Sequence, residues 1–518
     1  MTTQTLAPGN ADRRTRLRAA ASRRGVLVPV TLAVAFLVTH GVAQAVTPFI
    51  RQDDWTFLLP DNTTDVVPPS YYNISEGRWL NTGWWWLVGQ HGTPASAAIT
   101  YAVGYAVLVA GMWRVLRLAG VRPGLAVDAL LGLALYASAI WVQLLYWPGA
   151  LTPSIIVGAA AMWLLPSAAR TRRGFAVWLV LSGIGAVLTY PPIGVVLLIF
   201  AVLHQRDAAW RRVLAVVGAW VASFGIGVLV TYTLNLVVNQ HFGLRLAAWR
   251  QANTLTSLDA LRVNTGRWLE TVGALWSEQW WVGLIGLVAI GIGWSDATVR
   301  RRLQRLLVAF AVAIGIDAAQ TIGTGVVTEG RGQLWTWLLA VLPVALLLVP
   351  ASSTDAPTDA PTDAPTDARA SGARAPLPGG RLADQVATLL LGVLAIGGVL
   401  AWRADIGMHQ ATRMTFSAIA AQAGQAARQV AASTPDGSSP VIVLYQDPAV
   451  ADSRNGRLTL STFSMALRVE QGLVPRPCVG LECPQLATQR PGGVVQLEPP
   501  VSDRSVVGVV VPTPPGWL

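Results

Sequence analysis

The chain has 518 residues, of which 53% are hydrophobic and 13% charged, and its formal net charge is +11. A soluble domain carries about twice that charged fraction, and the apolar residues here come in long blocks, so an ordinary soluble protein is excluded. Every basic residue is an arginine, and the arginines gather between the apolar blocks, as in the cytoplasmic loops of membrane proteins. This distribution argues against nucleic-acid binding, and the lack of lysine excludes a P-loop lysine and Schiff-base chemistry.

The N-terminal part predicts a cytoplasmic leader followed by a membrane helix. Residues 1–24 are rich in arginine, and the apolar run 25–50 that follows is too long for the core of a signal peptide. We therefore expect a retained first helix that runs outward, with the N-terminus in the cytoplasm. Segment 51–92 is then an outer loop.

Residues 25–350 are expected to form a transmembrane core, because apolar blocks of spanning length alternate with basic loops. Segment 238–279, which is polar and rich in Arg and Trp, is expected to be a second outer segment. After the first helix, single helices are predicted at about 94–116, 125–147, 151–168, 213–237, 280–295, 306–323 and 333–350.

The apolar block 175–203 is flanked by arginines on both sides and is interrupted by Tyr190-Pro191-Pro192. A residue before proline disfavours helix. Two short helices that meet at an outer Tyr-Pro-Pro turn agree with the charges and with the length. A single proline-kinked helix is the alternative, and it would invert the orientation of everything downstream.

The C-terminal third contains a linker, a last membrane helix and a separate domain. Residues 351–383 include Thr-Asp-Ala-Pro repeats, which predict a disordered cytoplasmic linker. A last helix at 384–402 would leave 403–518 outside, where a helix-like stretch (404–432) and strand patterns at 441–445 and 506–511 predict a small α+β domain. The predicted fold is therefore an all-α polytopic membrane protein of about eleven helices with a small extracytoplasmic α+β domain.

Cys478 and Cys483 are the two cysteines of the chain and lie close together in this domain. Because disulfides persist in oxidising compartments, a local disulfide agrees with an outer location. Two free thiols are the alternative, and a zinc site is disfavoured because two thiolates fall short of four ligands.

The first outer loop contains the most informative polar residues: Asp53 and Asp54 directly after a membrane helix, flanked by Arg51 and Trp55. Adjacent carboxylates suit general-base catalysis or the binding of a divalent cation. A solvated pair that merely caps the loop is the alternative.

This Asp-Asp pair, followed in the same loop by Gly77-Arg78, resembles the polytopic GT-C-type glycosyltransferases, in particular the bacterial O-antigen glucosyltransferase-like group. Tyr190-Pro191 resembles a Tyr-Gln element of those proteins, with proline in place of glutamine. The resemblance implies transfer of a sugar from a polyprenyl-phosphate donor to a cell-envelope glycan or lipid acceptor at the outer face of a bacterial cytoplasmic membrane.

In that case Asp53 or Asp54 would be the base, and arginines would bind the leaving phosphate, since the planar guanidinium pairs with phosphate through two hydrogen bonds. The candidate cofactor is a divalent cation held by the same two carboxylates. The donor and acceptor would meet at residues of the outer segments and of one helix, namely Arg51, Trp55, Glu76, Arg78, Tyr190, Arg250, Asp317, Glu329 and Arg331.

Asp317 is singled out because it lies within a predicted membrane helix, where an acid is costly and usually functional. It suits the lining of a donor cavity or, alternatively, proton coupling in a transporter. Two other functions stay open: a transporter or flippase for an envelope lipid or polysaccharide, and a non-catalytic scaffold for envelope assembly. The lack of clear internal repeats and the few charges within helices favour the enzyme.

Overall fold

The structure is a computed structural model of the chain, and it is mostly helical. The predicted leader, most of the predicted linker, Glu329 and the side chains of Asp53 and Arg331 lie outside the residues that it describes. The described residues are 31, 34–59, 68–88, 92–121, 124–245, 250–328, 330–349, 378–434, 439–497 and 505–513.

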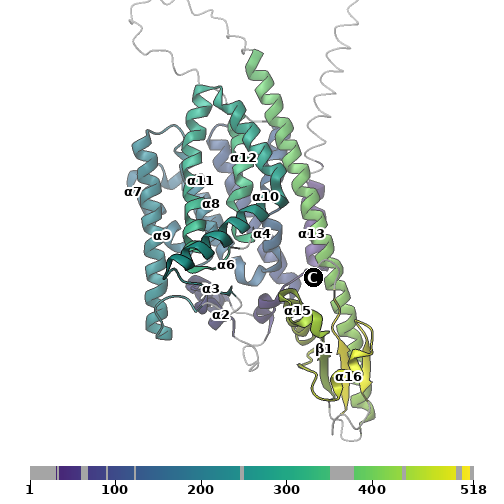
Figure 1. Ribbon diagram of the computed structural model, residues 1–518. Coiled ribbons are helices and arrows are strands. Elements are labelled where there is room, and N and C mark those ends of the chain that lie inside the picture. The colour runs from purple at the N-terminus through teal and green to yellow at the C-terminus, as the bar shows by residue number, and fades with distance from the viewer. Residues whose placement is uncertain are drawn as a thin grey trace, which may run out of the picture.

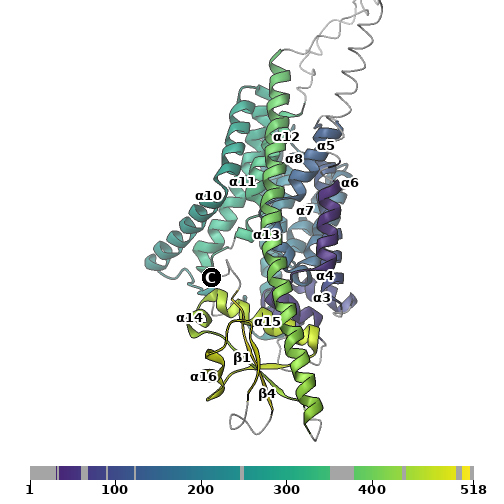
Figure 2. The same cartoon turned by 90° about the vertical axis from the view of Figure 1, so that its right-hand side faces the viewer.

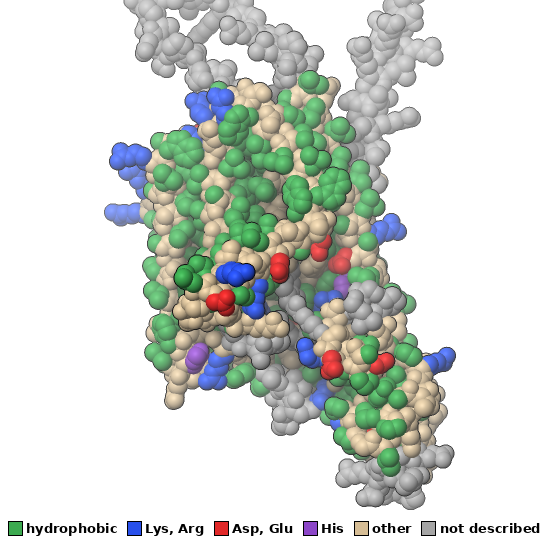
Figure 3. All heavy atoms as spheres, in the orientation of Figure 1, with side chains coloured by type: hydrophobic (Ala, Val, Ile, Leu, Met, Phe, Trp, Pro, Cys, Tyr) green, Lys and Arg blue, Asp and Glu red, His purple; other side chains and the backbone are tan. Residues whose placement is uncertain are grey.

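Six helices in the described part of the chain are long and apolar enough to cross a membrane. Exposed apolar side chains cover much of their outer surface, as a lipid environment requires (Figure 3). The six helices are α4 (Pro94–Leu118), α6 (Pro148–Ala168), α9 (Trp210–Asn239), α10 (Leu258–Trp294), α11 (Ala297–Thr324) and α13 (Pro378–Ser433).

The other helices of the bundle have fewer than 18 described residues, and α5 is shorter than the helix predicted at 125–147. At about 1.5 Å per residue, the 12 residues of α5 and the 13 of α12 cover well under the roughly 30 Å of a bilayer core. Their paths are completed by 3₁₀ turns, η2 (Trp141–Tyr146) after α5 and η4 (Gly330–Gly332) before α12. The single helix predicted at 125–147 is therefore wrong beyond Tyr136. These shorter helices are Val34–Val46, α5 (Leu125–Tyr136), α7 (Arg172–Val187), α8 (Pro191–His204) and α12 (Trp335–Leu347).

The block 175–203 forms two helices rather than one kinked helix. Helix α7 ends at Val187 and α8 begins at Pro191, with Tyr190 in an extended conformation between them. Proline is well suited to the first position of a helix, where no N–H is needed, and it keeps the preceding residue out of the helical region. The two-helix interpretation of Tyr-Pro-Pro is confirmed.

Helix α10 corrects the prediction for segment 238–279. The Ser257 side chain accepts a hydrogen bond from Ala260 N and starts the helix, which runs to Trp294 with a kink at Gln279. The segment 238–279, for which the sequence predicted an outer location but no helix, therefore contains a helical limb, 258–278. In Figure 1 this limb crosses the front of the bundle obliquely, and the limb after the kink rises within the bundle.

Helix α13 is continuous through the boundary predicted at 402/403. Its 56 residues run along one side of the bundle and project beyond it into the C-terminal domain (Figures 1 and 2). The predicted last membrane helix and the helix-like stretch 404–432 are thus one element. The domain is attached to the core by a rigid helix, not by a loop.

The C-terminal domain is built on a four-stranded sheet with strand order β2-β1-β4-β3. Strand β1 pairs in parallel with β2 and β4, and β3 pairs antiparallel with β4. One face of the sheet packs on α13 and α15 through Phe416 and Phe463, and the other face packs on Leu486 of α16. Two of these strands are those predicted from sequence. The elements are β1 (Val441–Tyr445), α14 (Pro448–Ala451), α15 (Arg454–Gln471), β2 (Pro475–Pro477), α16 (Glu482–Ala487), β3 (Val494–Leu497) and β4 (Val506–Val510).

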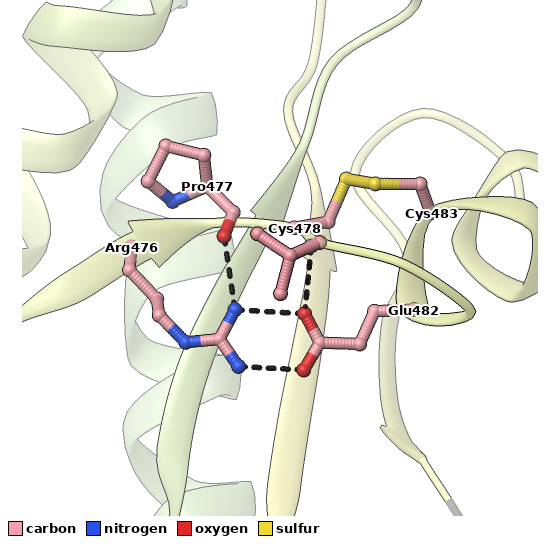
Figure 4. The surroundings of a disulfide bond; sticks show 6 residues. Arg476, Pro477, Cys478, Glu482 and Cys483 are labelled. Atoms are coloured by element: carbon pink, nitrogen blue, oxygen red, sulfur yellow. Dashed lines mark hydrogen bonds and ion pairs between the residues drawn. A yellow bond between two sulfur atoms is a disulfide. The ribbon is translucent and has the colours of Figure 1, made fainter. Parts of the chain in front are cut away.

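A disulfide joins Cys478 and Cys483, whose Cα atoms lie 5.3 Å apart (Figure 4). Inside the same loop the Arg476 guanidinium donates two hydrogen bonds to the Glu482 carboxylate, at 2.7 and 2.6 Å, and Val479 N donates a third at 2.9 Å. These bonds lower the pKa of Glu482, mainly through Arg476. The loop is therefore held by an ion pair as well as by the disulfide.

Three arginine stretches between helices lie at one end of the bundle, opposite the C-terminal domain. Helices α7, α9 and α11 begin near arginine stretches at the end that is uppermost in Figures 1 and 3. The C-terminal domain and the short helices α2 (Pro69–Ser75) and α3 (Trp79–Val88) lie at the other end. The arginine stretches that precede α7, α9 and α11 thus share one end of the bundle.

Helix α13 comes very close to the core at Gly398, and we expect a larger side chain at this position to destabilise the protein. A β-carbon at Gly398 would lie 2.0 Å from the Ala137 carbonyl oxygen and 3.2 Å from Trp337, whereas one at Gly392 would meet nothing within 4 Å. We expect Gly398→Val to push α13 off α5 and α12 and to lower the free energy of unfolding by about 1–3 kcal/mol, the range for overpacked cores. Gly392→Val on the same helix is the matched control. Thermal unfolding of the detergent-purified proteins measures the difference, and equal stability of the two variants would contradict this packing.

Candidate functional site

Asp54 lies in the 3₁₀ helix η1 (Gln52–Leu58), directly after the first membrane helix. Its carboxylate is 1% exposed and accepts hydrogen bonds from Ala150 N, at 2.6 Å, and from Gly149 N. Both N–H groups belong to the first turn of α6, where a helix has no internal acceptor for them. The positive end of the helix dipole adds to the attraction. Asp54 therefore caps a buried helix start.

Gly149 allows this close approach. A β-carbon there would lie 3.0 Å from Asp54 Oδ2 and 3.0 Å from the Phe57 ring. Phe57 is buried and packs against Trp85 of α3, with the ring centroids 5.1 Å apart and the ring planes tilted. Helix α3 also contacts the first turn of α6, since Asn81 Nδ2 donates a hydrogen bond to the Ala150 carbonyl at 2.8 Å. The start of α6 thus fixes η1 and α3 together.

This geometry gives Asp54 a structural contact. Both of its carboxylate oxygens accept hydrogen bonds from backbone N–H groups of α6. In the described part of the chain no group of three or more His, Cys, Asp and Glu side chains could hold a metal ion. The hydrogen bonds of Asp54 join η1 to the start of α6, and its predicted roles as a base or a cation ligand stay predictions.

A second cluster joins residues from the two outer segments. Glu76 Oε2 lies 3.4 Å from Arg78 Nη2, and Glu76 Oε1 accepts a hydrogen bond from Arg250. The side chains of Glu76, Arg78 and Arg250 are 20%, 13% and 22% exposed. Two guanidinium groups therefore lie against one carboxylate in a partly buried setting. Such an arrangement suits the binding of an anion with planar or tetrahedral oxygens.

Aromatic rings and a glycine turn fix Arg78. Its Cζ lies 5.8 Å from the centroid of the Tyr72 ring and 5.7 Å from that of Tyr190, within cation–π range. Gly77 precedes it with a φ of +77°, and a β-carbon there would lie 2.6 Å from Thr231. Only glycine adopts this turn at this distance without strain. The Gly77-Arg78 pair of the sequence is thus a tight turn that aims an arginine at Tyr190.

Tyr190 also lies beside the turn that carries Arg331. A β-carbon at Gly332 would lie 4.0 Å from Tyr190 Oη and 3.9 Å from Pro192. The backbone of η4 is therefore next to the Tyr190 turn. The structure brings together Glu76, Arg78, Tyr190 and Arg250, and places the backbone of Arg331 at their edge.

Asp317 is tied to the same turn from the other side. Its Oδ2 accepts hydrogen bonds from Trp268 Nε1 and from Gln333 Nε2, both at 3.1 Å, and the residue is 8% exposed. Gln333 follows η4 directly, and Trp268 lies on the first limb of α10. Asp317 thus joins α11 to two other elements, which accounts for an acid inside an apolar helix without a transported proton.

Arg51 and Trp55 lie at the contact with the C-terminal part of the chain. The Arg51 guanidinium lies over the rings of Tyr146 and Trp147, at 5.7 and 5.6 Å. Trp55 is fully buried and packs with Ile50 and with Ala466 of α15. Neither ring face of Trp55 is open for stacking on a sugar, so its place in the structure is that of a packing anchor.

Arg413 of α13 is a buried residue that the sequence interpretation missed. Its guanidinium pairs with Glu470 of α15, its Nε donates to the Pro48 carbonyl at 3.0 Å, and its Cζ lies 4.9 Å from the Trp55 ring. One turn earlier His409 Nε2 lies 3.6 Å from Asp405 Oδ1, and Asp405 accepts a hydrogen bond from the Tyr146 hydroxyl. The i, i+4 spacing of Asp405, His409 and Arg413 on one helix face was the signal for this polar seam.

Comparison with known proteins adds no relative: no family model, no curated protein and no solved structure matches the chain. The site is therefore interpreted from its own residues.

The contact of Arg413 with Glu470 predicts a coupling between the C-terminal domain and η1. We expect Arg413→Met and Glu470→Gln each to destabilise the protein, with a coupling energy of about 1–3 kcal/mol in a double-mutant cycle, because each single change leaves a poorly hydrated charge unpaired. Thermal unfolding of the four proteins gives this energy. The Arg476–Glu482 pair, which joins β2 to α16, serves as the control for η1. Removal of this pair should leave hydrogen exchange in residues 50–58 unchanged, whereas Arg413→Met should accelerate it. Additive effects of Arg413→Met and Glu470→Gln on the free energy of unfolding would contradict the contact.

Proposed function

We propose that the protein is a membrane glycosyltransferase, which moves a sugar from a polyprenyl-phosphate donor to a cell-envelope glycan or lipid acceptor at the outer face of a bacterial cytoplasmic membrane. The observation that carries the proposal is the cluster of Arg78 and Arg250 around Glu76, next to Tyr190. These four residues were selected from the sequence and come from three distant segments. Their convergence at the end of the bundle that bears the C-terminal domain gives a donor phosphate a cationic site.

The roles follow from the chemistry of the transfer. An acceptor hydroxyl attacks the anomeric carbon, the bond from that carbon to the phosphate oxygen breaks, and polyprenyl phosphate leaves with the bonding electrons. Arg78 and Arg250 stabilise the charge on the leaving phosphate, which grows in the transition state. Asp53 accepts the proton of the hydroxyl. Asp54 holds η1 on α6 and so positions its neighbour, because its own oxygens are engaged.

The membrane arrangement that we propose has about eleven crossings and a GT-C-like core. Ten apolar helices in the described residues would supply ten of these crossings, and α7 would supply another. Since basic loops stay in the cytoplasm, the arginine-rich end is the inner one. The N-terminus is then cytoplasmic, and the C-terminal domain is extracytoplasmic, where it binds the acceptor or a partner protein.

A transfer assay in sealed right-side-out vesicles tests activity and orientation together. We expect labelled sugar to pass from a panel of polyprenyl-phosphate donors to a membrane-impermeant glycan acceptor outside the vesicles. Asp53→Asn should lower the rate by about 100-fold or more, the usual loss for a general base, at equal protein abundance and unchanged thermal stability. Arg78→Lys should weaken donor binding, since lysine lacks the planar fork.

Asp452→Asn, an exposed carboxylate in the C-terminal domain, is the matched control and should retain full activity. Equal transfer by wild type and Asp53→Asn would place the chemistry elsewhere. Transfer only in inverted vesicles would reverse the proposed orientation.

A further inference from the structure

The first limb of α10, residues 258–278, has one side bound to the bundle. Asn264 Nδ2 donates to the carbonyl oxygens of Asn253 and Ile322, at 2.7 and 2.9 Å, and Arg267 Nη1 donates to that of Gly325 at 2.9 Å. Ile322 and Gly325 lie at the C-terminal end of α11. These bonds hold the limb at the level where α11 ends, on the side of the bundle that carries the C-terminal domain.

A second side of the limb is an exposed apolar stripe. Leu258, Leu269 and Trp276 are 84%, 56% and 57% exposed. They are separated by eleven and seven residues, which is about three and two helical turns, so they point in one direction. Leu261 and Val272, also eleven residues apart, are exposed beside them, and exposed Arg262 lies along the edge of the stripe that faces the carboxylates. Contiguous apolar patches of this kind mark a binding surface, whereas single exposed apolar residues do not.

A third side of the limb is polar. Asp259 and Glu270 are exposed and again eleven residues apart, but they point away from the stripe. In Figure 3 charged side chains gather along the lower edge of the oblique limb, and hydrophobic side chains continue above it. The limb therefore presents different surfaces in three directions: hydrogen bonds to the bundle, apolar side chains toward the middle of the bundle's height, and carboxylates toward the outer end.

We propose that residues 258–278 form an interfacial helix, which rests on the lipid bilayer with the apolar stripe among the acyl chains and the carboxylate edge among the headgroups. This three-sided pattern is the one that a helix beside a membrane protein needs at a membrane–water interface. The inference is independent of the proposed enzymatic function.

The apolar stripe of the first limb continues into the exposed apolar surface of the second limb. This continuity favours a bilayer over a protein as the partner of the stripe. Past the kink at Gln279 the second limb of α10 exposes Leu284 and Leu287, within a helix apolar enough to span a membrane. Trp276 and Trp280 flank the kink, and tryptophan is enriched at the headgroup level. The limb carries two arginines and three carboxylates, so it has no excess of positive charge that would attract anionic lipid. Burial of its apolar side chains therefore holds the limb on the bilayer.

Site-directed spin labelling of the full chain in phosphatidylcholine vesicles tests this placement. The native cysteines form a disulfide and do not react, so single nitroxides can be attached at Leu269→Cys and at its neighbour Glu270→Cys. Leu287→Cys supplies the lipid reference and Asp452→Cys the aqueous reference. Collisions with oxygen, which concentrates in acyl chains, are compared with collisions with a water-soluble nickel complex.

We expect the ratio of oxygen to nickel collisions at position 269 to equal that at 287 and to exceed that at 270 several-fold. Position 270 should resemble 452, and added phosphatidylglycerol should leave all four ratios unchanged. A ratio at 269 equal to that at 452 would place the stripe in water and overturn the proposal. Shielding of 269 from both reagents would show a protein occupant, and a response confined to phosphatidylglycerol would show charge-driven binding; either result also overturns it.

Discussion

A helix that begins inside a protein must find acceptors for its first N–H groups, and α6 finds them in one side chain, Asp54. The consequences extend through the outer end of the molecule. Because Asp54 is held on α6, η1 is fixed, and Trp55 on the same turn becomes the surface on which α15 rests. Arg413 then joins that tryptophan to α13 and to Glu470. One capping interaction thus determines where the C-terminal domain sits on the membrane core.

The same requirement accounts for the polar residues at this end of the bundle. Helices α5 and α12 stop well short of a bilayer's thickness, and non-helical backbone at membrane depth is tolerated only where protein or water satisfies it. Asn264 serves this purpose by donating to the Ile322 carbonyl at the end of α11, and Asp317 joins α11 to the side chains of Trp268 and Gln333. The Glu76 cluster differs from them, because two guanidinium groups meet there on one carboxylate. These two guanidinium groups are why the proposed anion site is placed there and not at Asp317.

Sequence reasoning was sufficient where a single local rule decides the structure. The break at Tyr190 follows from proline geometry, and the strands at 441–445 and 506–510 follow from short apolar runs. It failed where distant contacts decide. The predicted helix at 125–147 ends at Tyr136, whose carbonyl is bound by Tyr105 from another helix. The limb 258–278 is stabilised by α11, and the role of Asp54 depends on α6, which is nearly a hundred residues away in sequence. No local pattern distinguishes a capping carboxylate from a catalytic one.

The most direct test of this account is hydrogen–deuterium exchange of the start of α6 in the Asp54→Ala protein. The account predicts fast exchange at Gly149 and Ala150 and in η1, with α12 unchanged, because the two amides lose their acceptor. Asp128→Ala, which removes another carboxylate from the first turn of a helix, should leave α6 as protected as in the wild type. Unchanged exchange at Gly149 and Ala150 in Asp54→Ala would contradict the central role of this cap.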